Sequence, residues 1–205
     1  MPIVFPEKKL VIATHNAGKV KEFVYLFKEV GLINHAELTL ISASELQLPE
    51  PIEDGVSFAE NAALKSRAAA NASGLAALAD DSGLCVDGLD GAPGIYSARW
   101  AQDKNFSPAF QRIERELNTR GIMPHGAKAA FICVLSLTLP NGETLLAEGK
   151  INGFLCFPPR GENGFGYDPI FIPEGETRCF AQMSAAEKNH YSHRARAVSE
   201  LKKQL

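Results

Sequence analysis

The sequence has no long apolar run, no excess of basic residues and no apolar signal segment near its N-terminus. No stretch approaches the roughly 20 apolar residues that a membrane-spanning helix requires, so we expect a cytoplasmic protein that does not bind membranes. Its 21 Lys and Arg residues are outnumbered by 24 Asp and Glu residues, which gives a net charge of −3. We therefore expect no binding to a nucleic-acid backbone, although a single nucleotide needs only a local cluster of cations.

Closely spaced cysteines are also missing. The four cysteines form no Cys-x-x-Cys pair, and no histidine lies at zinc-ligand spacing from them. The pattern indicates ordinary reduced thiols that are mostly buried. These residues are Cys85, Cys133, Cys156 and Cys179.

The 205 residues are 45% hydrophobic, which is sufficient for a substantial core. Helices alternate with strands early in the chain and a long hairpin follows, which predicts an α/β (mixed α+β) architecture around a mixed sheet in one domain, residues 1–205. Ser57 and Glu60 form a capping-box pattern at the start of the second helix, and Gly74 ends it. The predicted strands cover 9–13, 38–41, 76–79, 127–139, 144–151 or beyond, and 169–172, and the other predicted helices cover 20–30, 108–120 and the C-terminal segment.

Two adjacent acids, Asp80 and Asp81, follow a short apolar run and precede a Ser-Gly pair, which predicts a turn at a strand end. Mg²⁺ is bound by one or two carboxylates plus substrate phosphates, so the pair is a candidate metal site. A solvated Asp-Ser-Gly turn is the alternative. Glu53 lies in an acidic loop and has no capping role, so it is a candidate second ligand, although an exposed loop acid would look the same.

The segment Thr14-His15-Asn16-Ala17-Gly18-Lys19 lies between a predicted strand and a predicted helix. The N-terminus of a helix favours a phosphate, and Lys19 adds a positive charge. The segment does not match a Walker A motif. An ordinary capped helix start with a surface lysine is the alternative.

The segment 164–169 places two aromatic residues and an acid among glycines. Aromatic rings stack on bases, and Asp168 could bind a base edge or orient a cation. For Tyr167 a place in the apolar core is an equal alternative. Cationic donors also gather around the start of the last helix, where they could bind phosphate or oxo groups or could form a charged surface. These donors are Lys188, His193 and Arg194.

Taken in order, five segments resemble the signature of the Ham1/RdgB family of non-canonical purine nucleoside triphosphate pyrophosphatases. The resemblance covers nearly the whole chain, from about Leu10 to the final helix. It implies a long mixed central sheet flanked by helices, two lobes with an active-site cleft between them, and a homodimer. The segments are 14–19, 58–62, 79–99, 164–171, and 187–188 with 192–194.

The resemblance implies Mg²⁺-dependent hydrolysis of ITP, dITP or XTP at the α phosphorus, which releases a nucleoside monophosphate and pyrophosphate. It assigns Asp81 as general base and metal ligand, with Asp80 and Glu53 as further metal ligands. His15 departs from the small or polar residue that the family usually has, and Trp100 replaces a frequent tyrosine. The implied purine nucleotide-binding residues are Thr14, His15, Asn16, Ala17, Gly18 and Lys19 for the phosphates, Ser82, then Phe165, Gly166, Tyr167 and Asp168 around the base, and Lys188, His193 and Arg194.

Two other functions fit parts of the pattern. A phosphomonoesterase could use Asp80 or Asp81 as a covalent nucleophile, but the sequence lacks the D-x-D arrangement of such enzymes. A non-catalytic purine nucleotide-binding module could retain the pocket alone. The full set of candidate acids argues against that module.

Overall fold

The computed structural model describes residues 8–32, 38–103 and 105–205. Contacts divide the chain into two compact units, which we call unit 1 and unit 2. Six strands follow the order β2-β1-β3-β4-β5-β6, and β3, β4 and β5 each continue from one unit into the other. Unit 1 comprises Met1–Asp81, Cys133–Gly149 and Arg194–Leu205, and unit 2 comprises Ser82–Ile132 and Lys150–His193. The expected single domain over residues 1–205 stays a prediction.

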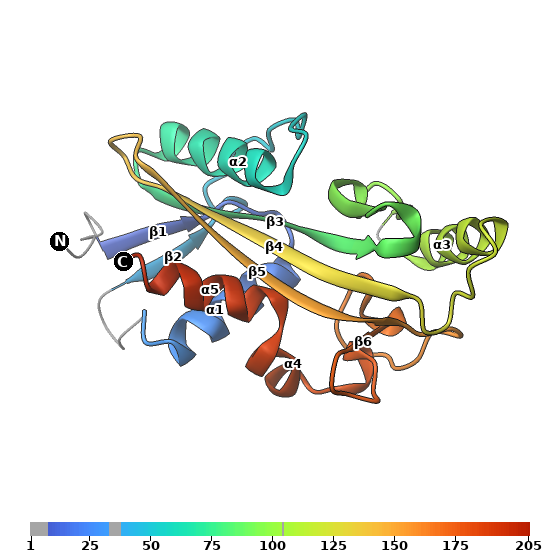
Figure 1. The fold of residues 1–205 in the computed structure, drawn as a ribbon. Helices are drawn as coiled ribbons and strands as arrows, with labels where there is room; N and C mark the ends of the chain where they lie inside the picture. Colours follow the sequence, from blue (N-terminus) through green and yellow to red (C-terminus); the bar gives the residue numbers. More distant parts are fainter. Residues whose placement is uncertain (1–7, 33–37, 104) are drawn as a thin grey trace. The chain divides into compact units, whose positions relative to one another are not determined.

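In unit 1, β1 (Lys9–Ile12) lies parallel to β2 (Thr39–Ser42) and to β3 (Ala76–Val86). Side chains alternate between the faces of a strand, so neighbouring residues pack against different helices. Leu10 and Ile12 pack with α1 (Ala17–Glu29) and α5 (His193–Lys202), whereas Val11 and Ala13 pack with α2 (Phe58–Ser73). Figure 1 shows α2 on one face of these strands and α1 with α5 on the other.

Unit 2 has its own apolar core. Helix α3 (Ser107–Thr119) buries Ile113 and Leu117 against residues of β3, β4 (Lys128–Thr138) and β6 (Phe171–Pro173). Strand β5 (Thr144–Leu155) pairs with β6 in antiparallel orientation, so the sheet is mixed, as predicted. Helix α4 (Ala185–Tyr191) was not predicted, because seven residues are too few to show a helical period.

The predicted turn after Asp81 is wrong, since β3 continues for 11 residues through both acids to Val86. Leu84 and Val86 are buried and carry the strand into the core of unit 2, which outweighs the turn preference of the Ser-Gly pair. Gly83 permits this path because a Cβ there would collide with the carbonyl oxygen of Gly94. The predicted strand 169–172 begins two residues too early, because residues 169 and 170 belong to the 3-10 turn Asp168–Ile170 that precedes β6.

Most other expectations for the described residues are confirmed. Gly74 ends α2 in the left-handed region at φ 70°, and Ser57 caps its start through the N–H of Glu60. The Glu60 carboxylate, however, accepts the N–H of Val56 instead of the N–H of Ser57 that a capping box requires. All four cysteines are free, and no helix of the described part is long and apolar enough to cross a membrane.

We expect Gly83→Ala to lower the free energy of unfolding by about 2 kcal/mol, because the added methyl group meets the Gly94 carbonyl and the Ser97 hydroxyl. Chemical denaturation followed by circular dichroism measures this change. Val56→Ala, at a position that is 82% exposed, is the control and should change stability by less than about 0.5 kcal/mol. Equal stability of Gly83→Ala and wild type would contradict the close approach.

Candidate functional site

The predicted phosphate segment is the N-terminus of α1. Asn16 caps the helix, and its Oδ1 accepts the N–H groups of Gly18 at 2.9 Å and Lys19 at 3.3 Å. Helix α1 therefore begins at Ala17, three residues before the predicted start, because the strong N-cap preference of asparagine places the boundary. The helix N-terminus and Lys19 together favour an anion at this point.

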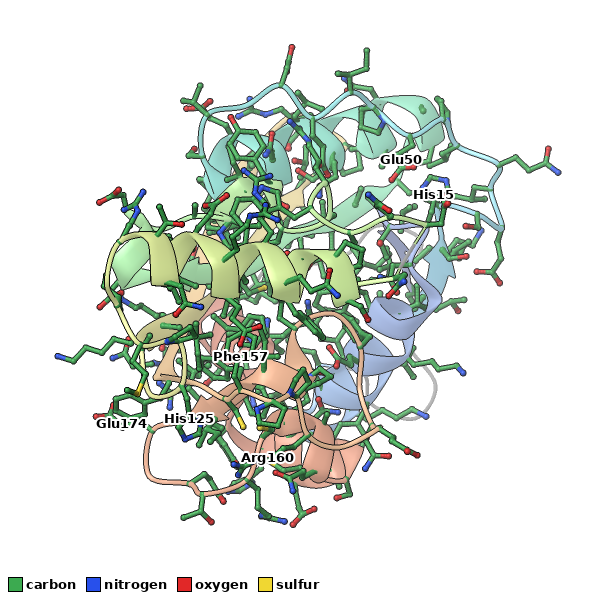
Figure 2. The ribbon with its side chains drawn as sticks, turned by 90° about the vertical axis from the view of Figure 1, so that its right-hand side faces the viewer. His15, Glu50, His125, Phe157, Arg160 and Glu174 are labelled. Carbon is green, nitrogen blue, oxygen red and sulfur yellow. The ribbon has the colours of Figure 1, made fainter. Side chains whose placement is uncertain are left out.

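His15 lies beside the loop that leads toward Glu53. Its Nε2 donates to the carbonyl oxygen of Leu48 at 3.2 Å, and its Nδ1 lies 4.0 Å from the Glu50 carboxylate. Figure 2 shows His15 and Glu50 next to each other. The ring thus connects the phosphate segment to this loop, and its contact with a substrate stays a prediction.

Asp80 faces α1 and α5. Its Oδ2 lies 2.8 Å from Lys19 Nζ and 3.4 Å from Arg194 Nη2, and Arg194 also binds Glu22 through Nη1. The Arg194 side chain is only 2% exposed, so the surface alternative does not apply to this residue. Glu22 was missed by the sequence analysis, and its position three residues after Lys19 on one helix is the signal that could have found it.

The pKa of Asp80 lies well below its usual range. Burial alone would raise this pKa, but the charges of Lys19, Arg194 and Lys65 outweigh burial. Asp80 therefore stays ionised throughout the neutral range. Burial would lower the pKa of Arg194, but the charges of Glu22 and Asp80 hold it above its usual value.

Asp81 faces α2. Its Oδ2 accepts a hydrogen bond from Asn61 Nδ2 at 3.0 Å, and its Oδ1 lies 3.7 Å from Lys65 Nζ. Lys65 also donates to Glu53 Oε1 at 2.6 Å, so both carboxylates face one cation. Lys65 was not predicted from the sequence, although its spacing of four residues from Asn61 places both on one helix face.

The pKa of Asp81 is raised, in contrast to that of Asp80. Burial raises it, while Lys65 and the Asn61 hydrogen bond only partly oppose this effect. Two neighbouring acids with pKa values pushed in opposite directions have different chemical capacities. Asp80 is suited to hold cations, and Asp81 is suited to exchange a proton.

The Glu53 and Asp81 pair fits a hard divalent cation. Within the described ranges no three acidic, histidine or cysteine side chains gather into a ligand group. The two carboxylates on Lys65 already share one positive charge, and Mg²⁺ commonly takes one or two protein carboxylates and completes its shell with water and phosphate. The donor chemistry therefore suits Mg²⁺ better than a metal that needs a full protein cage.

In unit 2 the structure brings Phe165, Asp168 and Lys188 together. Lys188 Nζ donates to Asp168 Oδ2 at 2.7 Å, and the same oxygen accepts the Phe165 N–H at 2.9 Å. The ammonium also lies 4.8 Å from the centre of the Phe165 ring. Gly164 is required here because a Cβ would collide with the Asp168 carboxylate. This group combines an aromatic face with a fixed cationic donor.

Tyr167 and His193 are held in the core of unit 2. The Tyr167 hydroxyl donates to the Ser97 carbonyl at 2.9 Å, and its ring meets Phe106 edge to face. His193 stacks on Phe131 with ring centres 4.7 Å apart. These contacts favour the core interpretation of Tyr167, which is 3% exposed. Of the remaining predicted residues, Ser82 follows Asp81 in β3 and Gly166 has φ 67°.

Comparison with known proteins identifies relatives over nearly the whole chain. Residues 10–204 match the model of the Ham1 family. A "dITP/XTP pyrophosphatase" of Gluconobacter oxydans is 51% identical over 195 residues, which is 95% of this chain and 89% of that protein. Its counterpart in Rhodospirillum centenum is 51% identical over 201 residues, or 98% of this chain and 96% of that protein.

Solved structures of Ham1 proteins are also similar to this chain over nearly its whole length. A HAM1 protein from Coxiella burnetii superposes with a TM-score of 0.83 at 35% sequence identity, covering 96% of this chain and 97% of that chain. The Staphylococcus aureus Ham1 protein gives a TM-score of 0.78 at 38% identity, with the same coverage of both chains.

We expect Asp80→Asn to lower the free energy of unfolding by about 3 kcal/mol at neutral pH, because Lys19 and the buried Arg194 lose a charged partner. Because the folded-state pKa of Asp80 is below the unfolded value, its contribution is present above about pH 4 and is lost as the pH falls further. The variant should therefore lose less stability than wild type on acidification. Denaturation between about pH 6 and pH 2 measures both effects, with the exposed Asp54→Asn as control. If the stability of Asp80→Asn depended on pH in the same way as that of wild type, the lowered pKa of Asp80 would be contradicted.

Proposed function

The chain belongs to the Ham1 family, and from this premise we propose that it hydrolyses dITP, XTP and ITP to a nucleoside monophosphate and pyrophosphate. The name dITP/XTP pyrophosphatase, which the curated relatives carry, supports this substrate class. The observation that carries the proposal is that the two neighbouring acids have different partners. Asp80 binds Lys19, whereas Asp81 faces Lys65 together with Glu53.

We propose Glu53 and Asp81 as the ligands of Mg²⁺. When bound, Mg²⁺ would neutralise negative charge that develops on the triphosphate during hydrolysis. Asp80 is also a predicted ligand, and this role stays a prediction. Its Oδ2 binds Lys19 and Arg194. We therefore assign Asp80 to orienting Lys19 toward the phosphates.

Asp81 is proposed as the general base for the attacking water. Its Oδ2 accepts the Asn61 amide, so Oδ1 is the oxygen that would accept the proton of the water. The water oxygen then bonds to the α phosphorus and the bond to the pyrophosphate oxygen breaks. Lys19 and the N-terminus of α1 bind the phosphates, because positioning and electrostatics supply most of the catalysis in phosphoryl transfer.

Phe165 and Lys188 are proposed to recognise the base. Phe165 offers a stacking face, and Lys188 is a donor without acceptor capacity, held in place by Asp168. Such a donor pairs with the 6-oxo oxygen of hypoxanthine or xanthine. It finds no acceptor in the 6-amino group of adenine, which disfavours ATP.

A homodimer in the cytoplasm that binds neither nucleic acid nor membranes completes the proposal. The dimer is supported by the family resemblance, and the other properties are supported by the composition. These properties and the binding roles of Ser82, Gly166 and His193 stay predictions.

Product analysis tests the activity. With Mg²⁺ and dITP, the wild type should release pyrophosphate and monophosphate in equal amounts, and Asp81→Asn should reduce kcat at least 100-fold by removing the base. The exposed Asp54→Asn on the same loop as Glu53 should retain full activity. Orthophosphate as sole product would instead indicate a phosphomonoesterase, and tight dITP binding without turnover would indicate a binding module.

Lys188→Met should reduce discrimination between bases. The variant keeps an unbranched side chain but loses the donor, so the ratio of kcat/KM for dITP to that for dATP should fall at least tenfold. Steady-state kinetics with both nucleotides measures the ratio. Lys203→Met, at a side chain that is 65% exposed, is the matched control. An unchanged ratio would assign base selection to other residues.

A further inference from the structure

Asn61 is completely buried in the first turns of α2, and both ends of its side-chain amide are used. Oδ1 accepts the backbone N–H of Gly55 at 2.9 Å, and Nδ2 donates to Asp81 Oδ2 at 3.0 Å. A backbone N–H can only donate, so the amide oxygen must face Gly55 and the NH₂ group must face Asp81. The orientation of this amide is therefore fixed by its two partners.

Gly55 approaches Asn61 so closely that no side chain fits between them. A Cβ at position 55 would lie 2.6 Å from Asn61 Oδ1 and 2.8 Å from Glu60 Cβ. The next residue adds a second hydrogen bond between the loop and α2, because the Val56 N–H donates to Glu60 Oε2 at 2.9 Å. The loop that carries Glu53 is thus held directly against the start of α2.

The amide consequently spans two elements that supply the proposed metal ligands. On one side it holds the backbone two residues after Glu53, and on the other it holds one oxygen of Asp81. Asp81 Oδ1 is left facing Lys65, whose ammonium binds Glu53 Oε1 at 2.6 Å. Hydrogen bonds of this kind to a ligating carboxylate fix which oxygen is presented and in what direction.

We propose that Asn61 is a positioning residue that sets the separation of Glu53 and Asp81 and presents Asp81 Oδ1 to the metal and the water. This inference rests on the proposed function. It assigns Asn61 no contact with the nucleotide, since the residue acts through the two acids. Loss of the amide should therefore weaken metal binding and catalysis while nucleotide affinity changes little.

Two variants test the inference by different routes. Asn61→Ala removes the amide. Gly55→Ala keeps every polar group but displaces the Asn61 oxygen, and Gly55 does not have a positive φ that would strain an alanine. Asn71→Ala, on an exposed position of the same helix, and Val56→Ala, on the same loop, are the matched controls.

The first readout is the affinity for Mn²⁺ in the absence of nucleotide, which is measured by electron paramagnetic resonance of the free ion. Both variants should bind Mn²⁺ at least tenfold more weakly than wild type, as expected for loss of an outer partner of a metal ligand. The controls should stay within about twofold of wild type. The second readout is dITP hydrolysis at saturating Mg²⁺, in which kcat should fall at least tenfold while KM changes less than about threefold.

The outcomes distinguish a failure of the positioning role of Asn61 from a failure of the proposed function. Folded Asn61→Ala or Gly55→Ala protein with wild-type Mn²⁺ affinity and kcat would overturn the inference, as would a rise in KM alone. If Asn61→Ala does not fold, Gly55→Ala decides by the same criteria. Wild-type protein that binds no Mn²⁺ and releases no pyrophosphate would contradict the proposed function and this inference with it.

Discussion

The alternation of side chains along β3 is the constraint on which the site in unit 1 depends. Successive residues of a strand face opposite sides, so Asp80 and Asp81 cannot share one environment. Asp80 joins the face that packs against α1 and α5, where Lys19 and Arg194 surround it. Asp81 joins the face that packs against α2, where Asn61 and Lys65 meet it. An acid pair in a turn would impose no such separation.

This separation explains how neighbouring carboxylates acquire opposite pKa shifts. Both are buried, which by itself raises the pKa of each. Asp80 has two cations on one oxygen and remains charged, so it can fix Lys19 in place. Burial raises the pKa of Asp81, and the neutral amide on one oxygen and the more distant ammonium on the other oppose this rise only in part. Electrostatic environment, more than residue type, distinguishes their roles.

Much of this could be predicted from the sequence. Apolar periodicity located the principal strands and helices, and the ordered motifs selected several of the residues that the structure groups around Asp80, Asp81 and Lys188. The turn after Asp81 was wrong because local turn preference is weaker than the burial of Leu84 and Val86. Glu22 and Lys65 were missed because helical spacing shows only which residues share a helix face, whereas the packing of the helices on the strands decides which charges meet.

The net charge around the acids favours the binding of a metal ion together with the triphosphate. The described network contains three cations, Lys19, Lys65 and Arg194, against four carboxylates, Glu22, Glu53, Asp80 and Asp81. Three positive charges against four negative ones leave a net charge of −1, which repels a polyanionic triphosphate. Each of these cations already binds an acid, so substrate phosphates must compete for them. A divalent cation on Glu53 and Asp81 would reverse the sign of the net charge and allow the N-terminus of α1 and Lys19 to bind the phosphates.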